Sequence, residues 1–184
     1  MREEELKFRE LRADEIEGRG GTVSKAGKGL SLLLYKTSRT DQDILDETVG
    51  PEKWQCRFYE CKGTLFCSIG IRVEHSDGTS EWVWKDNAGS PSNMEAAKGE
   101  ASDCIKRAGS AWGIGRCLYT APFIWVNADK CNLIPRGNGF TCNDRFKVAK
   151  IQIDENPETG RRRITGIRIV NEKTGQIVFS WKEN

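Results

Sequence analysis

Residues 92–116, SNMEAAKGEASDCIKRAGSAWGIGR, place apolar side chains at the three-to-four-residue spacing of one helix face. We therefore predict a helix whose buried stripe consists of Met94, Ala97, Ala101, Cys104, Ile105, Ala108, Ala111 and Trp112. Ser92 lies three residues before Glu95, which predicts a capping box at the start of this helix. Gly113 follows the stripe and is expected to supply the left-handed residue that ends the helix.

The polar positions of the same helix form a basic edge. Lys98, Ser102 and Lys106 recur every four residues and therefore line up along one flank. Arg107 lies about 100° further round the helix, beside Asp103 one turn earlier. The simpler interpretation is a core helix whose charged edge contributes only solubility, and the alternative is an edge that runs along a polyanion. For Arg107, an ion pair with Asp103 and a contact with phosphate both remain open.

Alternation with period two precedes the helix. It predicts strands at Leu65–Glu74 and Thr79–Lys85, joined through the turn-forming dipeptide Asp77-Gly78. Such a turn sets two cross-strand pairs, Val73 with Trp82 and Ile71 with Trp84. Both tryptophans are then expected on the apolar face beneath the helix, so they are not assigned to a ligand.

The same patterns predict the remaining elements. They are a charged helix over residues 3–17, a strand at Leu30–Tyr35, a helix from Ser38 that stops at Gly50-Pro51, a strand from Trp54, a loop at Asn127–Thr141, and strands at Phe146–Asp154, Arg162–Asn171 and Gln176–Trp181. This order indicates the α+β class, with helices packed on one face of an antiparallel sheet.

Composition narrows the function classes only slightly. The chain has 184 residues and a net charge of +2, of which residues 1–18 account for −3 and the remainder for +5. The bases gather at 19–39 and 161–163, which permits a nucleic-acid partner without requiring one. No apolar run is long enough for a membrane span and the first residues are unlike a signal peptide, so we expect a cytoplasmic protein without a membrane partner.

Cysteine and histidine do not point to a metal or a cofactor. Seven cysteines, an odd number without a C-x-x-C pair, are typical of a reducing compartment, and we expect them to act as small buried hydrophobes. The single histidine, His75, lies at a turn. A structural zinc site would need four ligands from scattered positions, so we expect neither metal nor cofactor. A metal-dependent nuclease is disfavoured for the same reason.

Two longer segments carry a family resemblance. They are YKTSRTDQDILDETVGPEKWQ and KGEASDCIKRAGSAWGIGRCLY, with a hairpin between them. In this order they resemble the single-strand annealing domain of the Rad-fifty-two superfamily, in its DdrA-like or phage-borne branch. The resemblance covers about Lys25 to Leu118. Its most specific part is the K-x-x-A-x-D-x-x-K-R-A spacing, met by Lys98, Ala101, Asp103, Lys106, Arg107 and Ala108.

This resemblance implies a non-enzymatic protein that binds single-stranded DNA and anneals complementary strands without ATP, in recombination or double-strand break repair. It implies a β-β-β-α core, assembly into rings or helical homo-oligomers, and a basic groove that holds the DNA backbone. Position by position, Lys98, Lys106 and Arg107 match the basic residues of the family's helix. Lys25 matches the basic residue before the first core strand, and Arg39 matches the basic residue that follows the tyrosine of that strand. A further basic position of the family is Ser110 in this chain.

Two more basic residues, Lys28 and Arg116, are added to the candidate site on physical grounds. Lys28 shares with Lys25 the glycine neighbours that let a backbone approach a ligand, although a solvated loop is the alternative. Arg116 has the forked guanidinium that suits phosphate oxygens. Tyr35 and Trp54 have the flat rings that stack on bases, but core packing is the simpler interpretation.

The expected organisation is an N-terminal charged helix and linker at 1–21, an annealing core domain at 22–126, and a loop with a C-terminal β-rich extension at 127–184. Single-stranded DNA and further copies of the chain are the expected partners, with a single-strand-binding protein as a third, at the nucleoid of a bacterial cell or phage-infected host. The alternatives are a module that coats DNA without annealing, a metal-dependent nuclease, and a purely structural oligomer.

Overall fold

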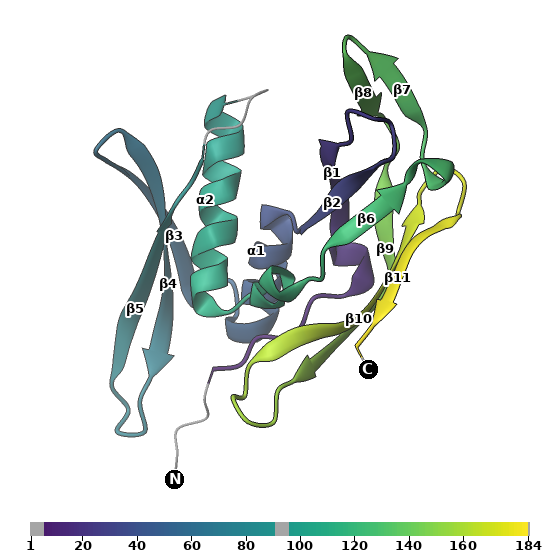
Figure 1. The fold of residues 1–184 in the computed structure, drawn as a ribbon. Coiled ribbons are helices and arrows are strands. Elements are labelled where there is room, and N and C mark those ends of the chain that lie inside the picture. Colours follow the sequence, from purple (N-terminus) through teal and green to yellow (C-terminus); the bar gives the residue numbers. More distant parts are fainter. Residues whose placement is uncertain (1–5, 91–95, 184) are drawn as a thin grey trace. The chain divides into compact units, whose positions relative to one another are not determined.

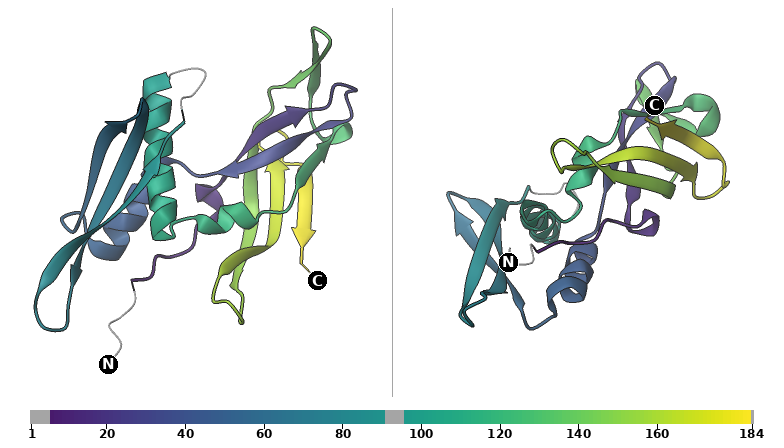
Figure 2. Two further views of the ribbon diagram at one scale, coloured as in Figure 1. Left: turned by 60° about the vertical axis from the view of Figure 1, so that its left-hand side comes forward. Right: turned by 90° about the horizontal axis from the view of Figure 1, so that it is seen from below.

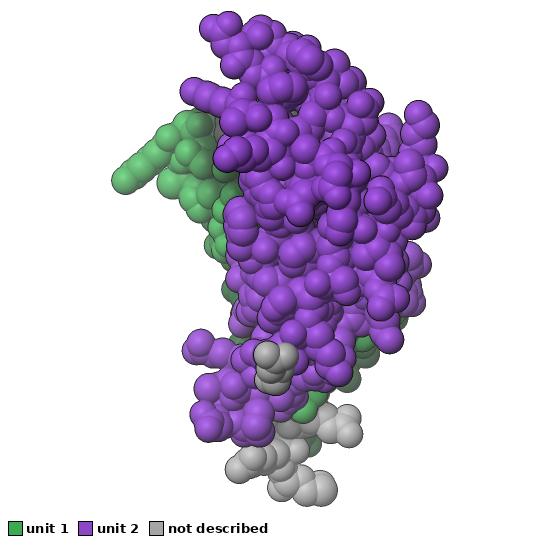
Figure 3. Space-filling view, turned by 45° about the vertical axis from the view of Figure 1, so that its right-hand side comes forward, with its two compact units in different colours: residues 1–10, 37–115 green, residues 11–36, 116–184 purple. Residues whose placement is uncertain are grey.

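The computed structural model describes residues 6–90 and 96–183, with only the backbone at 96–98. These residues form a mixed α+β protein with antiparallel sheets and two α-helices (Figure 1). Two compact units are present, shown in different colours in Figure 3: unit 1 comprises residues 1–10 and 37–115, and unit 2 comprises residues 11–36 and 116–184. Each unit is therefore assembled from two separate stretches of chain.

Unit 1 contains a three-stranded antiparallel sheet in the order β3-β4-β5. Its elements are α1 (Ser38–Val49), β3 (Trp54–Cys61), β4 (Thr64–Glu74), β5 (Ser80–Ala88) and α2 (Ala96–Trp112). Helix α2 packs on β4 and β5, and α1 contacts α2 and β3, so both helices lie on the same side of this sheet (Figure 2). The core beneath them is formed by Ile44, Leu45, Cys67, Ile69, Ile71, Cys104 and Ala108, all at most 1% exposed.

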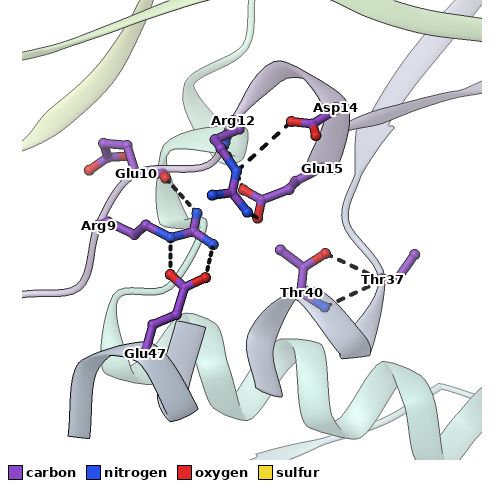
Figure 4. A network of polar contacts seen from close by, with 8 residues as sticks. All are labelled: Arg9, Glu10, Arg12, Asp14, Glu15, Thr37, Thr40 and Glu47. Carbon is purple, nitrogen blue, oxygen red and sulfur yellow. Dashed lines mark hydrogen bonds and ion pairs between the residues drawn. The ribbon is translucent and has the colours of Figure 1, made fainter. Parts of the chain in front are cut away.

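Helix α1 begins and ends where the sequence predicts. The hydroxyl of Thr37 accepts a hydrogen bond from the Thr40 amide at 3.4 Å, which caps the first turn (Figure 4). Gly50 has a φ of +90° and precedes a proline, so the helix stops at Val49. The N-terminal segment is tied to this helix by Arg9, whose Nη2 donates to Oε1 of Glu47 at 3.2 Å (Figure 4).

Helix α2 confirms the predicted central helix over its described part, with Cys104 and Ala108 fully buried on the stripe. Its end is a Schellman motif: the amide of Gly113 donates to the Ser110 carbonyl and that of Ile114 to the Gly109 carbonyl, both at 3.0 Å. Gly113 has a φ of +106°, the left-handed conformation expected of it. The predicted cap at Ser92 lies outside the described residues, as do Met94 and the side chain of Ala97.

The hairpin between β4 and β5 exists, but its predicted register is wrong by one residue. Trp82 lies opposite Arg72 and Trp84 opposite Gly70. The connection is longer than the dipeptide turn predicts, because the His75 amide donates to the Thr79 carbonyl at 2.8 Å and closes a wider loop. Since a one-residue slip moves every side chain to the other face, both tryptophans lie on the face that carries Arg72, away from α2.

Unit 2 is built on a six-stranded antiparallel sheet in the order β11-β10-β9-β1-β2-β6. Its strands are β1 (Glu17–Val23), β2 (Gly29–Tyr35), β6 (Ile124–Asn127), β9 (Phe146–Glu155), β10 (Arg162–Asn171) and β11 (Ile177–Lys182), with a separate hairpin of β7 (Leu133–Arg136) and β8 (Gly139–Cys142). Short 3₁₀ turns occur at η1 (Ala13–Glu15), η2 (Arg116–Thr120) and η3 (Ala128–Lys130).

The three predicted C-terminal strands are confirmed as β9, β10 and β11. Three other expectations are wrong. Residues 6–16 contain only the turn η1, where Arg12 pairs with Glu15 at 3.0 Å (Figure 4), instead of a charged helix. Residues 127–141 hold the β7–β8 hairpin instead of a loop. The strand at Leu30–Tyr35 belongs to the sheet of unit 2, so it does not share a sheet with the predicted hairpin.

Strand β1 was missed because its sequence, EGRGGTV, has poor intrinsic strand propensity. Its glycines are used for close approach. A Cβ at Gly21 would lie 2.7 Å from the Ser31 hydroxyl on β2, and one at Gly18 would lie 3.3 Å from Phe146 on β9. Pairing with its hairpin partner β2 and with β9, which is distant in sequence, thus overrides the local preference.

Candidate nucleic-acid interface

The N-terminus of α1 lies against the predicted basic flank of α2. The hydroxyls of Ser38 and Ser102 are 3.1 Å apart, which places the first turn of α1 beside the middle of that flank. We call this region the α1–α2 edge and define it by Ser38, Arg39, Lys98, Ser102 and Lys106. All five residues belong to unit 1.

The α1–α2 edge gathers positive charge from two elements. Arg39 is exposed in the first turn of α1. The same turn presents the amide groups of a helix N-terminus, which carry a partial positive charge and favour anions. Lys106 lies one turn beyond Ser102, with a side chain that is 27% exposed. The backbone of Lys98 lies in α2, and its side chain is outside the described residues.

Asp103 forms ion pairs with two neighbouring basic residues of α2, Lys106 and Arg107. Its Oδ1 lies 3.6 Å from Lys106 Nζ, and its Oδ2 accepts hydrogen bonds from Arg107 Nε at 2.8 Å and from the Ser90 amide at 3.1 Å. Partial burial raises the pKa of the Asp103 carboxyl, but Arg107, the Ser90 amide and Lys106 together outweigh this effect, so the pKa lies below its ordinary value. The ion pair considered for Arg107 is thus present.

Arg107 lies on a different side of α2 from the α1–α2 edge. Its carbonyl accepts a hydrogen bond from the Asn87 side chain of β5 at 3.4 Å, and its own side chain is 44% exposed. Because Asp103 contacts both Arg107 and Lys106, the two bases are held together through one carboxylate. Sequence spacing identified the partner of Arg107 but missed that Lys106 shares it.

A buried carboxylate lies beneath the edge. Asp41 is fully buried in the first turns of α1, and a Cβ at Gly109 would lie 2.1 Å from its Oδ1. Gly109 is therefore the residue that lets α2 pass close to this carboxylate. A glycine inside an otherwise regular helix was the one signal in the sequence for such a close approach.

The two predicted lysines of unit 2 lie together in the loop between β1 and β2. Lys25 and Lys28 are both exposed. Hydrogen bonds from the Ser24 amide to the Gly29 carbonyl at 2.9 Å and from the Gly27 amide to the Ser24 carbonyl at 3.0 Å close this loop. The loop is therefore ordered by its own backbone bonds, and it presents both amino groups to solvent.

Aromatic rings flank this loop. A Cβ at Gly27 would lie 2.9 Å from the Phe140 ring, and one at Gly29 would lie 3.0 Å from the Trp125 ring. Trp125 stacks on Phe123, with ring centroids 6.3 Å apart, and Phe123 is 76% exposed. These rings were not predicted as part of the site, because they come from segments about a hundred residues further along the chain.

The other candidates are placed individually. Arg116 is exposed at the start of η2 in unit 2. Tyr35 donates its hydroxyl hydrogen bond to Glu17, and burial together with this carboxylate raises the pKa of Tyr35 to about 12. The indole N–H of Trp54 donates to Asp46 Oδ1 at 2.6 Å. Tyr35 and Trp54 are both half-buried and hydrogen-bonded, as expected of structural residues.

Two negative findings apply to residues 6–90 and 96–183. No group of three or more His, Cys, Asp or Glu side chains is arranged to hold a metal ion. None of the helices found there has the length and apolar character needed to cross a membrane.

The fold and these clusters define a mixed α+β protein with basic residues gathered at one edge of unit 1 and one loop of unit 2. Residues 9–132 match the family model described as Rad52/22 family double-strand break repair protein. The chain belongs to this family.

Two curated relatives are similar to it. Both are named single-stranded DNA-binding protein DdrA. The protein from Deinococcus deserti is 29% identical over 114 residues, covering 62% of this chain and 55% of the relative. The protein from Deinococcus radiodurans is 32% identical over 105 residues, covering 57% and 49%. The chain thus spans about half the length of the curated relatives it matches. No solved structure gives a significant match.

Proposed function

We propose that this chain binds single-stranded DNA and anneals complementary strands without ATP, as a non-enzymatic protein of recombination or double-strand break repair in a bacterial cell or phage-infected host. Family membership and the names of the two DdrA relatives support this proposal. The observation that carries it is the α1–α2 edge, where the Ser38–Ser102 contact places a helix N-terminus and Arg39 beside the basic flank of α2.

The chemistry of annealing suits this edge. A protein that anneals strands must neutralise phosphates along one strand while leaving base edges free to test a partner. Lys98 and Lys106 supply mobile point charges, and the α1 amides and hydroxyls supply neutral donors to phosphate oxygens. These groups bind the backbone without selecting a base. Lys25, Lys28 and Arg116 are proposed as phosphate contacts of unit 2 in their own right, and Arg107 is proposed to contact phosphate while it remains paired with Asp103.

We also propose that β3, β4, β5 and α2 constitute the β-β-β-α core that the family resemblance implies. Residues 22–126 are then the annealing part, which follows the segment 1–21, and residues 127–184 are an extension of it. Assembly of several copies into a ring or open helix would align the α1–α2 edges into one continuous track. A single-strand-binding protein is proposed as a further partner at the DNA.

The first experiment removes charge at one point of the edge. Lys106→Ala is expected to weaken binding to a single-stranded oligonucleotide and to lower the slope of log K against log salt by about 0.7 for the lost phosphate contact. Arg107→Ala is expected to lower the slope in the same way. Lys173→Ala is the control, because Lys173 is exposed in the turn between β10 and β11 of unit 2, outside the α1–α2 edge. Unchanged binding by Lys106→Ala with the oligomer intact would contradict the site.

Three further measurements separate the alternatives. A module that only coats DNA would bind oligonucleotides without accelerating the pairing of complementary strands. A metal-dependent nuclease would cleave labelled DNA in the presence of Mg²⁺ or Mn²⁺. A purely structural oligomer would show no salt-sensitive binding. Electron microscopy with and without single-stranded DNA tests the assembly, for which rings or filaments are the expected result.

A further inference from the structure

The sheet of unit 1 has a second face, opposite α2, that carries aromatic and arginine side chains. We call it the outer face of the β3–β4–β5 sheet and define it by Arg57, Tyr59, Phe66, Arg72, Trp82 and Trp84. The register assigns these residues to one face, since Tyr59 pairs with Phe66, Arg72 with Trp82, and Gly70 with Trp84. The α2 side is the other face, where the Trp112 indole donates to the Ile69 carbonyl at 2.9 Å.

The aromatic rings of the outer face lie side by side along the strands. Tyr59 stacks on Phe66, with ring centroids 5.4 Å apart and planes 17° apart. The centroids of Trp82 and Trp84 are 6.0 Å apart. A Cβ at Gly70 would come within 2.6 Å of the Trp84 ring, so the absence of a side chain there lets this ring lie flat on the sheet. Tyr59 remains 42% exposed.

Two arginines complete the outer face. The guanidinium of Arg57 lies 4.1 Å from the centroid of the Trp84 ring, a cation–π contact. Arg72 donates from Nε and Nη2 to the Ser80 hydroxyl at 3.1 and 3.0 Å. Among the described residues, both guanidiniums contact only neutral groups, including the Gln55 amide oxygen at 3.3 Å from Arg57. Their charge is therefore available to an anionic ligand.

An acidic side chain of this face, Asp86, is already engaged in hydrogen bonds. Asp86 accepts hydrogen bonds from the Tyr59 hydroxyl at 3.2 Å and from the Ser68 hydroxyl. These bonds hold the Tyr59 ring in place on the sheet. The outer face thus combines fixed, partly exposed rings with two arginine charges that have no carboxylate partner in the described part of the chain.

We propose that the outer face of the β3–β4–β5 sheet binds unpaired nucleobases of single-stranded DNA by stacking, with Arg57 and Arg72 contacting the adjoining phosphates. Every base has a flat π-face, so rings on a sheet bind bases with little regard to sequence, and arginine adds charge complementarity to the backbone. The inference rests on the proposed DNA binding and assigns to it a second surface. In this proposal the α1–α2 edge binds phosphates, whereas the outer face binds nucleobases.

The test compares an oligothymidylate with an abasic oligonucleotide of equal length, which has the same phosphates but no bases. The wild-type protein is expected to bind the oligothymidylate more tightly and to show quenched tryptophan fluorescence with it alone. Tyr59→Leu and Trp82→Leu are each expected to weaken binding to the oligothymidylate about fivefold or more, with binding to the abasic strand unchanged. Trp84→Phe keeps a ring over Gly70 and is expected to retain most of the affinity.

Phe58→Leu is the matched control. Phe58 is adjacent to Tyr59 on β3 and 47% exposed, but it pairs with Cys67 on the α2 side. It is expected to leave both affinities unchanged, and thermal unfolding establishes that each variant folds. The proposal would be overturned if folded Tyr59→Leu and Trp82→Leu bound the oligothymidylate with wild-type affinity. It would also be overturned if these variants changed the oligomeric state but left the ratio of the affinities for the oligothymidylate and the abasic strand unaltered, since the face would then bind a second copy of the chain. Absence of binding to either strand by the wild type would instead refute the proposed function.

Discussion

Arg107 and Asp103 form an ion pair one turn apart on α2, with Arg107 Nε 2.8 Å from Asp103 Oδ2. The same carboxylate lies 3.6 Å from Lys106. The Asp103 carboxylate thus neutralises part of the positive charge of Lys106 and Arg107, which are both candidates for phosphate contact. The pair holds both side chains in defined positions, but it also competes with DNA for them.

Replacing this acid is therefore expected to strengthen DNA binding. Asp103→Asn keeps a side-chain oxygen for the Ser90 amide and removes the charge that Lys106 and Arg107 share. Binding of single-stranded DNA, measured by titration at several salt concentrations, should tighten and show a steeper salt dependence. A small loss of stability with unchanged affinity would show that the pair is only structural.

The contribution of this pair to stability should depend on pH at the acid end. The pKa of Asp103 in the folded protein lies below its ordinary value, so the stabilisation is present above the unfolded-state pKa of about 3.9 and is lost as pH falls through the folded value. Such helical pairs contribute about 0.3–0.5 kcal/mol. Denaturant unfolding of wild type and Asp103→Asn should give a difference that is constant near neutral pH and shrinks below about pH 4. A difference that grows on acidification would contradict the sign.

Gly109→Ala should destabilise the protein, which is the reverse of the usual effect in a helix. Alanine ordinarily stabilises a helix interior by about 1 kcal/mol relative to glycine. Here its methyl group would meet the buried carboxylate of Asp41, since a Cβ would lie 2.1 Å from Oδ1. Unfolding experiments on Gly109→Ala, Asp41→Ala and the double variant give the coupling between the two sites. A gain in stability for Gly109→Ala, or strict additivity, would refute the clash.

Elements with a strong local pattern could be predicted from the sequence. The stops at Gly50-Pro51 and Gly113 set the ends of α1 and α2, and the apolar spacing identified the buried residues Cys104 and Ala108. The register of the hairpin could not be predicted, because it depends on how the loop around Asp77 closes. Its carboxylate accepts hydrogen bonds from the amide of Thr79 at 2.9 Å and from its hydroxyl at 2.6 Å, and these bonds stabilise a wider loop than the dipeptide implies.

Contacts between distant segments explain the rest. The Ser38–Ser102 contact that forms the α1–α2 edge joins residues 64 positions apart, and no periodicity indicates it. Spacing alone sets Lys106 and Arg107 about 100° apart round the helix, and it does not indicate that Asp103 contacts both of them. The predicted register of the hairpin puts Trp82 and Trp84 on the face beneath α2. Because this register is wrong, the sequence gives no indication of the aromatic cluster on the outer face of the sheet.

The paired cysteines of β3 and β4 should differ in reactivity. Cys56 and Cys67 have sulfur atoms 3.1 Å apart. The hydrogen bond from the Cys67 thiol lowers the pKa of Cys56 below its ordinary value, against partial burial, which raises it, while the same contact raises the pKa of the buried Cys67. Because the thiolate is the reactive form, Cys56 should be alkylated at a lower pH than an ordinary cysteine.

Rates of iodoacetamide modification at each site, followed by mass spectrometry from pH 6 to pH 10, measure this difference. Cys67→Ala removes the donor and should move the alkylation profile of Cys56 to higher pH. Cys67→Ser keeps a hydroxyl donor at the same position, so the profile of Cys56 should stay close to that of the wild type. Identical profiles for the alanine and serine variants would show that the hydrogen bond between the two sulfurs does not control the ionisation of Cys56.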